Sequence, residues 1–517
     1  MDTTHLEQGF LRSLVRYPDR PAIEAAGTTW TYAQLHERAR RLARALASAT
    51  PDDPPQAALL TARGPDAYAA VLAILYRGNA VVPLNPTDPP GLLAAFVDRA
   101  RVGAVLVDAT SAPLLLEAVT GLSRPLVVIP IDGAPLEVPP PHRVHPVGDQ
   151  PIDEPIPSSN GVAEVLFTSG STGRPKAVPV RHESLRAFVE GAVRRWRFGP
   201  EDRFSQTFDF TFDLHDFDLF VAWEVGACVV APPPGGTLLP IQWIRDAGLT
   251  VWFSVPSVGV LAHRTGALAP GRLGTLRWVG FCGEPLPCDL AEAWAAAAPN
   301  ARVENLYGPT ELTVACTSFR WRPGACVGGL VPIGDPLPGV RVAVVDASGR
   351  EVPDGAVGEL VATGPQRAEG YWEDPDASAA AFVELPGRPG TWYRTGDRVR
   401  RSEPGGPLCF VGRNDDQVQV RGHRVELRAV ESAARSAPGV TEAVVVPWPR
   451  VGARVEGLAA FVVGSTRLDV VRCHAASVLP RSHLPHTWRA LEQLPLTPRG
   501  KVDRAALVAT LAGEQQP

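Results

Sequence analysis

LFTSGSTGRPKAVPV, residues 166 to 180, brings hydroxyl groups, two glycines and a lysine together in one short stretch that follows an apolar run. Small residues let backbone N–H groups converge on an anion, and hydroxyl side chains add further donors, so the stretch suits phosphate. The candidate phosphate-binding residues are Thr168, Ser169, Gly170, Ser171, Thr172, Gly173 and Lys176. A Walker A loop would place its lysine directly after the second glycine, followed by Ser or Thr. The stretch therefore predicts a phosphate-binding loop of another class.

Lysine is nearly absent from the chain. Of the 50 basic residues, only Lys176 and Lys501 are lysines, and the others are arginines. An ammonium group is a compact point charge that can enter a narrow site, whereas a guanidinium is a wide planar fork. This difference sets the two lysines apart from the other cations of the chain.

The composition is that of a folded globular protein. A chain of 517 residues is too long for one simple core, so two or more domains are expected. A net charge of −5 with both signs mixed argues against a nucleic-acid partner. No apolar run is long enough for a membrane span, and no secretory signal is visible. The seven cysteines include no C-x-x-C pair, which predicts neither a zinc site nor a disulfide framework and favours a cytoplasmic location.

Apolar β-rich runs alternate with alanine-rich helical patterns. Strands are predicted within 80–85, 104–109, 125–131, 227–233 and 251–256, and the clearest predicted helices are 31–49 and 289–299. Such alternation predicts an α/β fold with largely parallel sheets. We expect a large core, residues 1–414, built from two α/β subdomains and a β-rich subdomain. A small mobile α+β domain is expected to follow over residues 415–517.

Seven ordered motifs extend over nearly the whole chain. They are LFTSGSTGRPKAVPVRHESL, FDFTFDLHDFDLF, NLYGPTELTVA, GELVATG, YRTGDRVRR, GRNDDQVQVRGHRVE and LPLTPRGKVDRAAL. This series resembles the adenylate-forming superfamily, which includes acyl-CoA synthetases, luciferases and the adenylation domains of nonribosomal peptide synthetases. The resemblance implies that ATP and Mg²⁺ are used to convert a carboxylate into an acyl adenylate, which is then transferred to a thiol.

The resemblance also implies roles for individual residues. The opening loop would hold the β- and γ-phosphates, with Lys176 and Lys501 catalytic and Lys501 reaching the α-phosphate from the small domain. The ATP-binding set also includes Gly283, Glu284, Tyr307 stacked on adenine, Asp397 accepting the ribose hydroxyls, and Arg413 beside it. Thr310 and Glu311 would act at the α-phosphate, where Glu311 would hold Mg²⁺. Asp415 matches the hinge of the small domain, and Gln419 stands where a lysine is usual.

Asp213 matches the family's amine-binding aspartate, which points to an amino acid as the substrate. An α-ammonium needs such a partner because an unpaired buried charge is costly. The aligned side-chain wall consists of Leu214, Phe217, Ser254, Gly280, Cys282, Leu306, Val314 and Ala315. This wall is mostly apolar and resembles the pockets of free-standing prolyl-carrier ligases. The small Gly280, Ser254 and Ala315 lead us to expect a side chain that is proline-like or somewhat larger.

The sequence therefore predicts a free-standing amino acid–carrier protein ligase of natural-product biosynthesis. Its partners would be an amino acid and a phosphopantetheinylated carrier protein supplied in trans, and the need for a small MbtH-like activator stays open. A D-alanine–carrier protein ligase is the first alternative, because the segment around Cys282 is similar to those enzymes. An acyl- or aryl-CoA synthetase comes next. A nucleotide-binding regulator without activity is disfavoured because Lys176, Glu311, Asp397 and Lys501 are all present.

Overall fold

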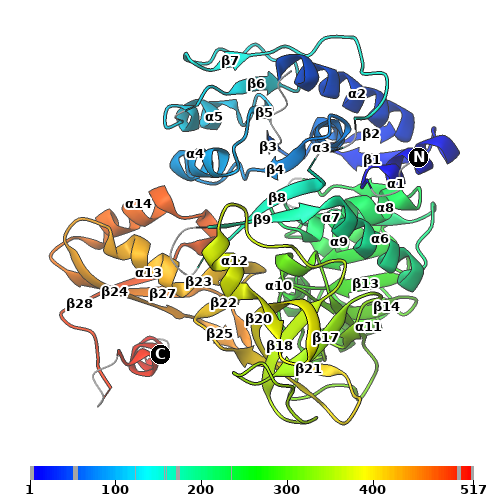
Figure 1. The fold of residues 1–517 in the computed structure, drawn as a ribbon. Coiled ribbons are helices and arrows are strands. Elements are labelled where there is room, and N and C mark those ends of the chain that lie inside the picture. The colour runs from blue at the N-terminus through cyan, green and yellow to red at the C-terminus, as the bar shows by residue number, and fades with distance from the viewer. Residues whose placement is uncertain are drawn as a thin grey trace. The chain divides into compact units, whose positions relative to one another are not determined.

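The computed structural model describes residues 5–50, 56–122, 124–156, 158, 160–170, 175–233, 236–497 and 502–513. The chain forms two compact units, which are best followed by colour in Figure 1. The first unit takes in residues 1–86, 94–167 and 177–414, and the second takes in 87–93, 168–176 and 415–517. The second unit thus combines the C-terminal segment with two short segments from earlier in the chain.

A seven-stranded sheet in the first unit leads to the phosphate-binding stretch. Its strands, in spatial order, are β7 (Arg143–Val144), β6 (Val127–Pro130), β5 (Ala104–Val107), β3 (Gln56–Leu60), β4 (Ala80–Pro83), β8 (Val162–Thr168) and β9 (Lys176–Arg181). The pairs from β7 through β8 are parallel, and β3, β4 and β5 are buried along their whole length. Parallel strands that are covered on both faces are apolar throughout, which is why these runs are continuous rather than alternating.

A nine-stranded sheet carries the residues predicted to contact the substrate. Its order is β16 (Asp335–Pro336), β15 (Thr317–Arg320), β14 (Arg302–Tyr307), β13 (Trp278–Phe281), β12 (Val251–Ser254), β10 (Arg203–Ser205), β11 (Cys228–Val230), β1 (Pro21–Ala25) and β2 (Thr28–Thr31). The pairs from β14 to β1 are parallel, and antiparallel strands complete both edges. The predicted α/β class with largely parallel sheets is confirmed.

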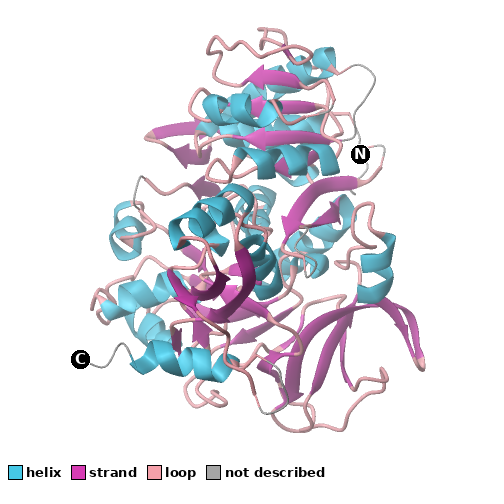
Figure 2. Cartoon of the chain, turned by 90° about the vertical axis from the view of Figure 1, so that its left-hand side faces the viewer, coloured by secondary structure: helices cyan, strands magenta, loops and turns pink. Residues whose placement is uncertain are grey.

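Helices pack against the strands of both sheets (Figure 2). They are α1 (Gln8–Arg16), α2 (Tyr32–Ala49), α3 (Pro65–Tyr76), α4 (Pro90–Arg99), α5 (Ala112–Val119), α6 (His182–Trp196), α7 (Leu214–Asp216), the π-helical η1 (Phe217–Val221), α8 (Ala222–Glu224), α9 (Pro240–Asp246), α10 (Pro256–Arg264), α11 (Cys288–Ala297) and the 3-10 helix η2 (Thr310–Leu312). Helix α3 is apolar on every side because it contacts β3 and β4 of one sheet and β1 and β2 of the other. Helix α2 begins at a capping box, in which Thr31 and Gln34 each accept the other's backbone N–H.

The predicted β-rich subdomain is also present in the first unit. It contains β17 (Arg341–Val345), β18 (Gly358–Thr363), α12 (Pro375–Ala381), β19 (Phe382–Leu385), β20 (Arg388–Arg401) and β21 (Leu408–Arg413). The second unit has the α+β texture expected after Asp415. It contains β22 (Gln417–Val420), β23 (His423–Glu426), α13 (Leu427–Arg435), β24 (Val440–Pro447), β25 (Arg450–Val451), β26 (Arg454–Val455), β27 (Leu458–Gly464), α14 (Leu468–Val478), the 3-10 helix η3 (Arg481–His483), β28 (Thr487–Leu491) and α15 (Arg504–Gly513).

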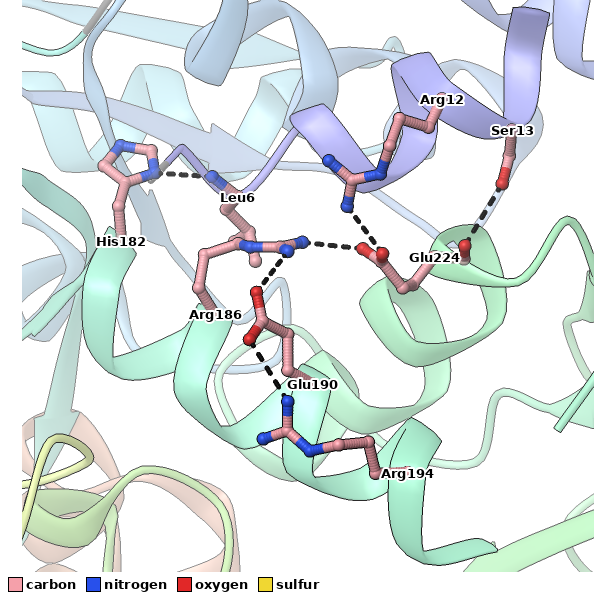
Figure 3. Close-up of polar contacts among 8 residues, drawn as sticks. All are labelled: Leu6, Arg12, Ser13, His182, Arg186, Glu190, Arg194 and Glu224. Carbon is pink, nitrogen blue, oxygen red and sulfur yellow. Dashed lines mark hydrogen bonds and ion pairs between the residues drawn. The ribbon is translucent and has the colours of Figure 1, made fainter. Parts of the chain in front are cut away.

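A charged network ties helix α1 to the rest of the first unit (Figure 3). Glu224, at the end of α8, accepts hydrogen bonds from Arg12 of α1 at 2.5 Å and from Arg186 of α6 at 2.6 Å. Arg186 also donates to Glu190 one turn along α6 at 2.7 Å. Gly9 allows this close approach, since a Cβ at that position would collide with the Glu224 carboxylate.

One cysteine pair departs from the sequence expectation. Cys288 and Cys326 form a disulfide, with their Cα atoms 6.2 Å apart and a sequence separation of 38. The pairing depends on how the following loop folds back: the Cys288 N–H donates to the Gly329 carbonyl at 3.1 Å. The prediction that no disulfide framework is present is therefore wrong at this pair. Sequence spacing alone could not show that this loop returns to the start of α11.

None of the described helices is both long and apolar enough to cross a membrane.

Candidate active site

Asp213 lies directly before α7, in the connection between β10 and β11, and is buried. Its Oδ2 accepts a hydrogen bond from the backbone N–H of Val314 at 3.2 Å. Val314 and its neighbour Thr313 have φ values of 64° and 55°. Branched side chains rarely adopt this left-handed conformation, so the surrounding structure must hold it in place.

Gln366 provides that support. Its Nε2 donates to the carbonyl oxygens of Leu312, Thr313 and Ala315 at 3.3, 3.1 and 2.8 Å. The Thr313 hydroxyl in turn donates to the Gln366 carbonyl at 2.7 Å. One buried amide thus fixes the segment that delivers the Val314 N–H to Asp213. Gln366 lies outside every motif, so its role could not be predicted from the sequence.

Burial raises the pKa of Asp213 to about 7, and hydrogen bonds from the Val314 N–H and the Thr310 hydroxyl oppose this shift. A cationic group bound beside the carboxylate would favour its charged form. The position is therefore suited to an ammonium ligand that arrives with its own positive charge.

Every residue of the predicted side-chain wall is buried. Exposed fractions run from 0% at Phe217, Ser254, Cys282, Val314 and Ala315 to 2% at Leu306 and 5% at Leu214. Gly280 does not leave free space, because a Cβ there would collide with the indole ring of Trp278, two residues earlier on β13. Trp278 also stacks on Phe217, with ring centroids 5.1 Å apart. Trp278 is thus a wall residue that the sequence analysis missed, and strand alternation from Gly280 would have indicated it.

The predicted ribose-binding residues come together around Asp397 on β20. The Tyr307 hydroxyl donates to Asp397 Oδ2 and Arg413 donates to Oδ1, both at 2.5 Å. The register of β20 and β21 places Asp397 directly opposite Arg413. A carboxylate offers about four lone-pair sites, which makes it a suitable acceptor for hydroxyl donors such as those of a ribose. Burial, and after it the charge of Asp397, raises the pKa of Tyr307 well above its usual value, which keeps this hydroxyl a donor.

Glu311 lies in η2 and is fully buried. Its Oε1 accepts a hydrogen bond from the Tyr371 hydroxyl at 2.8 Å, and its carbonyl accepts from the Ala368 N–H at 2.9 Å. A carboxylate with a neighbouring threonine hydroxyl is an oxygen donor set of the kind Mg²⁺ prefers, so Glu311 and Thr310 fit the ion chemically. Tyr371, which orients the carboxylate, was not anticipated from the sequence.

Gly283 and Glu284 follow β13 directly. Gly283 has a φ of 85°, a conformation that favours glycine. Glu284 Oε2 accepts the backbone N–H of Ser257 at 2.8 Å, at the start of α10. An acidic group is favourable at a helix N-terminus, so Glu284 has a structural role here besides any contact with ATP.

Part of the phosphate-binding stretch belongs to the second unit. Thr168 ends β8, and its buried Oγ1 has no hydrogen-bond partner in the described part of the chain. Ser169 Oγ donates to the Arg424 carbonyl at 2.7 Å, Gly170 is buried, and Lys176 begins β9. Ser171, Thr172, Gly173 and Lys501 lie outside the described residues.

The predicted hinge residue begins the C-terminal segment of the second unit. Asp415 Oδ1 accepts the N–H of Gln417 at 3.3 Å, and Gln419 lies on β22.

Comparison with known proteins identifies the class. A family model described as AMP-binding enzyme matches residues 10–372. The chain is 38% identical to IdnL7 over 99% of both chains, with a TM-score of 0.74. It is 30% identical to the Vibrio cholerae adenylation domain AlmE, solved in complex with glycyl-adenosine-5′-phosphate, over 99% of this chain and 98% of that one, with a TM-score of 0.88. The fold is therefore that of an adenylation domain, with a large N-terminal region and a small C-terminal part.

The chain belongs to the AMP-binding enzyme family, as the sequence resemblance predicted, and falls among its AMP-forming adenylation ligases related to nonribosomal peptide synthetases. It is 33% identical to tyrocidine synthase 3 of Brevibacillus parabrevis over 97% of this chain but only 8% of that protein. The chain spans between 6 and 35% of the length of the curated relatives it matches.

Proposed function

We propose that the chain activates an α-amino acid with ATP as an aminoacyl adenylate and passes the aminoacyl group to the phosphopantetheine thiol of a separate carrier protein. The observation that carries the amino-acid assignment is the buried Asp213, fixed by the Val314 N–H at 3.2 Å among otherwise uncharged wall residues. A carboxylate isolated in an apolar wall is costly unless a cation pairs with it, and an α-ammonium supplies that cation. Among the similar structures, AlmE was solved with an aminoacyl adenylate, which agrees with this assignment.

The same wall favours a compact side chain. Trp278 covers Gly280 and packs against Phe217. The absence of a side chain at position 280 therefore leaves no additional space for a substrate side chain. We therefore propose a small or compact apolar amino acid, up to the size of proline, which is the lower end of the proline-like or somewhat larger range expected from the sequence. The uncharged wall offers no partner to an acidic or basic substrate side chain.

The reaction joins two anions. A substrate carboxylate oxygen forms a bond to the α-phosphorus of ATP, and the bond from that phosphorus to the pyrophosphate leaving group breaks. Positioning and charge neutralisation carry most of such a reaction. Asp397, with Tyr307 and Arg413, would orient the ribose, and Asp213 would orient the amino acid. Glu311 and Thr310 would hold Mg²⁺, which offsets phosphate charge, and Lys176 and Lys501 would neutralise the phosphates and the reacting carboxylate.

Amino-acid-dependent exchange of pyrophosphate into ATP tests the proposal. Exchange should be strongest with glycine, alanine or proline and should be at background with fatty and aryl acids. Better exchange with a fatty or aryl acid would overturn the amino-acid assignment. Lys501→Ala should lower exchange about 100- to 1000-fold, as expected for one lost charge at a transition state. Transfer of a chemically supplied aminoacyl adenylate to a carrier protein should survive Lys501→Ala, and loss of both half-reactions would contradict the separate roles.

A further inference from the structure

Three charged side chains that the proposed reaction does not use meet in the core of the first unit. They are Glu164 on β8 and His215 and Asp216 on α7, with exposed fractions of 0, 1 and 0%. His215 Nε2 lies 3.4 Å from Glu164 Oε1 and 3.5 Å from Asp216 Oδ1, and one ligand atom from each residue falls within 4.8 Å of the others. This trio, here called the β8–α7 cluster, comes from two elements about 50 residues apart in sequence.

The carboxylates of the β8–α7 cluster are poorly satisfied by the protein alone. Both oxygens of Glu164 and both oxygens of Asp216 accept no hydrogen bond from the described residues. Within the same part of the chain, His215 is the only basic side chain at ion-pair distance from either carboxylate. Buried carboxylates are otherwise paired, hydrogen-bonded or bound to metal, because desolvating an unpaired charge is costly.

The imidazole of His215 is oriented like that of a metal ligand. Its Nδ1 lies 2.6 Å from the Phe212 carbonyl oxygen, which can only accept, so Nδ1 carries the proton. In the neutral form of the ring this tautomer presents the Nε2 lone pair to the two carboxylates. Metal-bound histidines use this arrangement, in which the outer ring N–H donates to a backbone carbonyl and fixes the tautomer. Without a cation between them, the lone pair and the carboxylates would repel one another.

The distances from His215 Nε2 to the two carboxylates distinguish a proton from a zinc ion as the cation between them. A proton on Nε2 would form charged hydrogen bonds of about 2.7–2.9 Å to the carboxylates. Donors bound to zinc at about 2.0–2.1 Å in a tetrahedron lie about 3.4 Å apart. The observed separations of 3.4 and 3.5 Å match the second geometry.

Charge balance points the same way. With both carboxylates ionised, an imidazolium leaves one negative charge in excess within the β8–α7 cluster, whereas a divalent ion with a neutral imidazole balances both carboxylates.

We propose that Glu164, His215 and Asp216 bind a structural Zn²⁺ ion in the core of the first unit. Zinc takes imidazole nitrogen and carboxylate oxygen together, and a second oxygen of either carboxylate or a water would complete four-coordination. The ion would join β8, which leads into Thr168 of the phosphate-binding stretch, to α7, which starts after Asp213. It would therefore hold β8 and α7 together without touching either substrate. This inference does not depend on which acid the enzyme activates.

A second cluster in the same unit supplies a matched control. His5, Glu7 and His182 also lie close together, with ring nitrogens of both histidines 3.9 Å from Glu7 oxygens. The facing nitrogen of His182, however, already accepts the Leu6 N–H at 3.1 Å (Figure 3). That lone pair is occupied, so this cluster should hold no metal.

Metal content measures the proposal directly. The full chain, expressed in zinc-supplemented minimal medium and dialysed against EDTA to remove loosely bound ions, should retain about one zinc per chain by mass spectrometry of the metal. His215→Gln should lower retained zinc at least tenfold, and Glu164→Gln should lower it as well. His182→Gln should leave the content unchanged. Retention by His215→Gln, or equal loss in His182→Gln, would place any ion elsewhere and overturn the proposal.

Cobalt substitution in the wild-type chain tests the proposal without depending on whether a variant folds. Expression with Co²⁺ in place of zinc should give the visible absorption bands of four-coordinate cobalt, and X-ray absorption should show one imidazole and oxygen donors with no sulfur. A chain free of retained zinc and cobalt would show that a protonated His215 holds the two carboxylates. Sulfur donors would also overturn the assignment.

Discussion

The backbone N–H of Val314 donates to Asp213 Oδ2 at 3.2 Å, so the proposed ammonium-binding carboxylate is held by a residue of the side-chain wall. Val314 can reach Asp213 only because it adopts a left-handed conformation, with a φ of 64°. Recognition of the substrate's amino group and of its side chain therefore share one loop, which Gln366 fixes.

Asp213→Asn should abolish most amino-acid activation. Removing one partner of a buried ion pair costs about 3–5 kcal/mol, which corresponds to a fall of about 100-fold or more in kcat/KM for the amino acid. The KM for ATP should change little. Asp209→Asn is the control, because Asp209 lies in the same motif but its side chain bonds only to Thr211, at 3.0 and 3.1 Å, among the described residues. Equal losses from both variants in the exchange assay would contradict the role given to Asp213.

Trp278→Ala should widen the range of substrates. Removing the indole that covers Gly280 opens space in the wall, so exchange with larger apolar amino acids should rise relative to glycine or alanine. Loss of a buried tryptophan also costs about 3–5 kcal/mol of stability. Trp294→Ala, at an equally buried position on α11, should cost similar stability without changing the preference. An unchanged preference in Trp278→Ala would show that the ring does not limit the pocket.

Tyr307→Phe should weaken ATP binding selectively. The variant keeps an aromatic ring for stacking but loses the hydrogen bond to Asp397. A hydrogen bond to a charged group is worth about 1.5–3 kcal/mol, so the KM for ATP should rise about 10- to 100-fold. Tyr32→Phe removes a comparable buried hydroxyl, which donates to the Ala227 carbonyl at 2.7 Å, and should leave the KM for ATP unchanged. A rise in the amino-acid KM alone would contradict the ribose role of Asp397.

Glu7 should make the stability of the chain fall as pH rises. Burial raises the pKa of Glu7 from 4.5 to about 7, against opposing effects of a backbone hydrogen bond and Arg186. Between these values the folded protein holds the proton that the unfolded chain has lost, so stability present below pH 4.5 is lost as pH rises to 7. Glu7→Gln removes this loss, and its stability advantage over wild type should grow by about 3 kcal/mol across that range.

Thermal unfolding of both proteins between pH 4.5 and 8 measures this difference. Glu201→Gln changes a carboxylate that is 85% exposed and should show no such trend. A Glu7→Gln advantage that shrinks with rising pH would reverse the sign and refute the prediction.

The Cys288–Cys326 disulfide should contribute to thermal stability. Closing a loop of 38 residues restricts the unfolded chain by about 4 kcal/mol. A reductant should therefore lower the melting temperature of wild type but not that of Cys288→Ser. Cys473→Ser changes an exposed free cysteine and should respond to reductant as wild type does. A wild-type melting temperature that ignores reductant would show that the bond adds nothing.

The fold class and several site residues were accessible from sequence because they lie in short linear patterns. Buried parallel strands appear as continuous apolar runs, and Tyr307, Asp397 and Arg413 each belong to a motif whose members the structure brings within hydrogen-bonding distance. In each such pattern, one short segment contains both the functional residue types and their characteristic spacing.

The roles of other residues could not be predicted in this way, because those roles depend on contacts with residues far away in the sequence. Gln366 acts on a loop about 50 residues earlier, and Tyr371 reaches Glu311 across 60 residues. Glu164 lies outside the seven motifs and His215 is unremarkable within its own, and only the packing of β8 against α7 makes them neighbours. The number and spacing of the cysteines could predict neither site. The β8–α7 cluster contains no cysteine, and Cys288 and Cys326 form no C-x-x-C pair.

The collision between residue 280 and the Trp278 ring also restricts how the pocket can change over evolution. A larger residue at position 280 cannot be tolerated first, because the indole already fills the space that its Cβ would need. A smaller residue at position 278 must come earlier, at a cost in stability, and only then does position 280 become free to vary. This pair of substitutions can therefore accumulate in one order only. The smaller residue at position 278 must come before the larger residue at position 280.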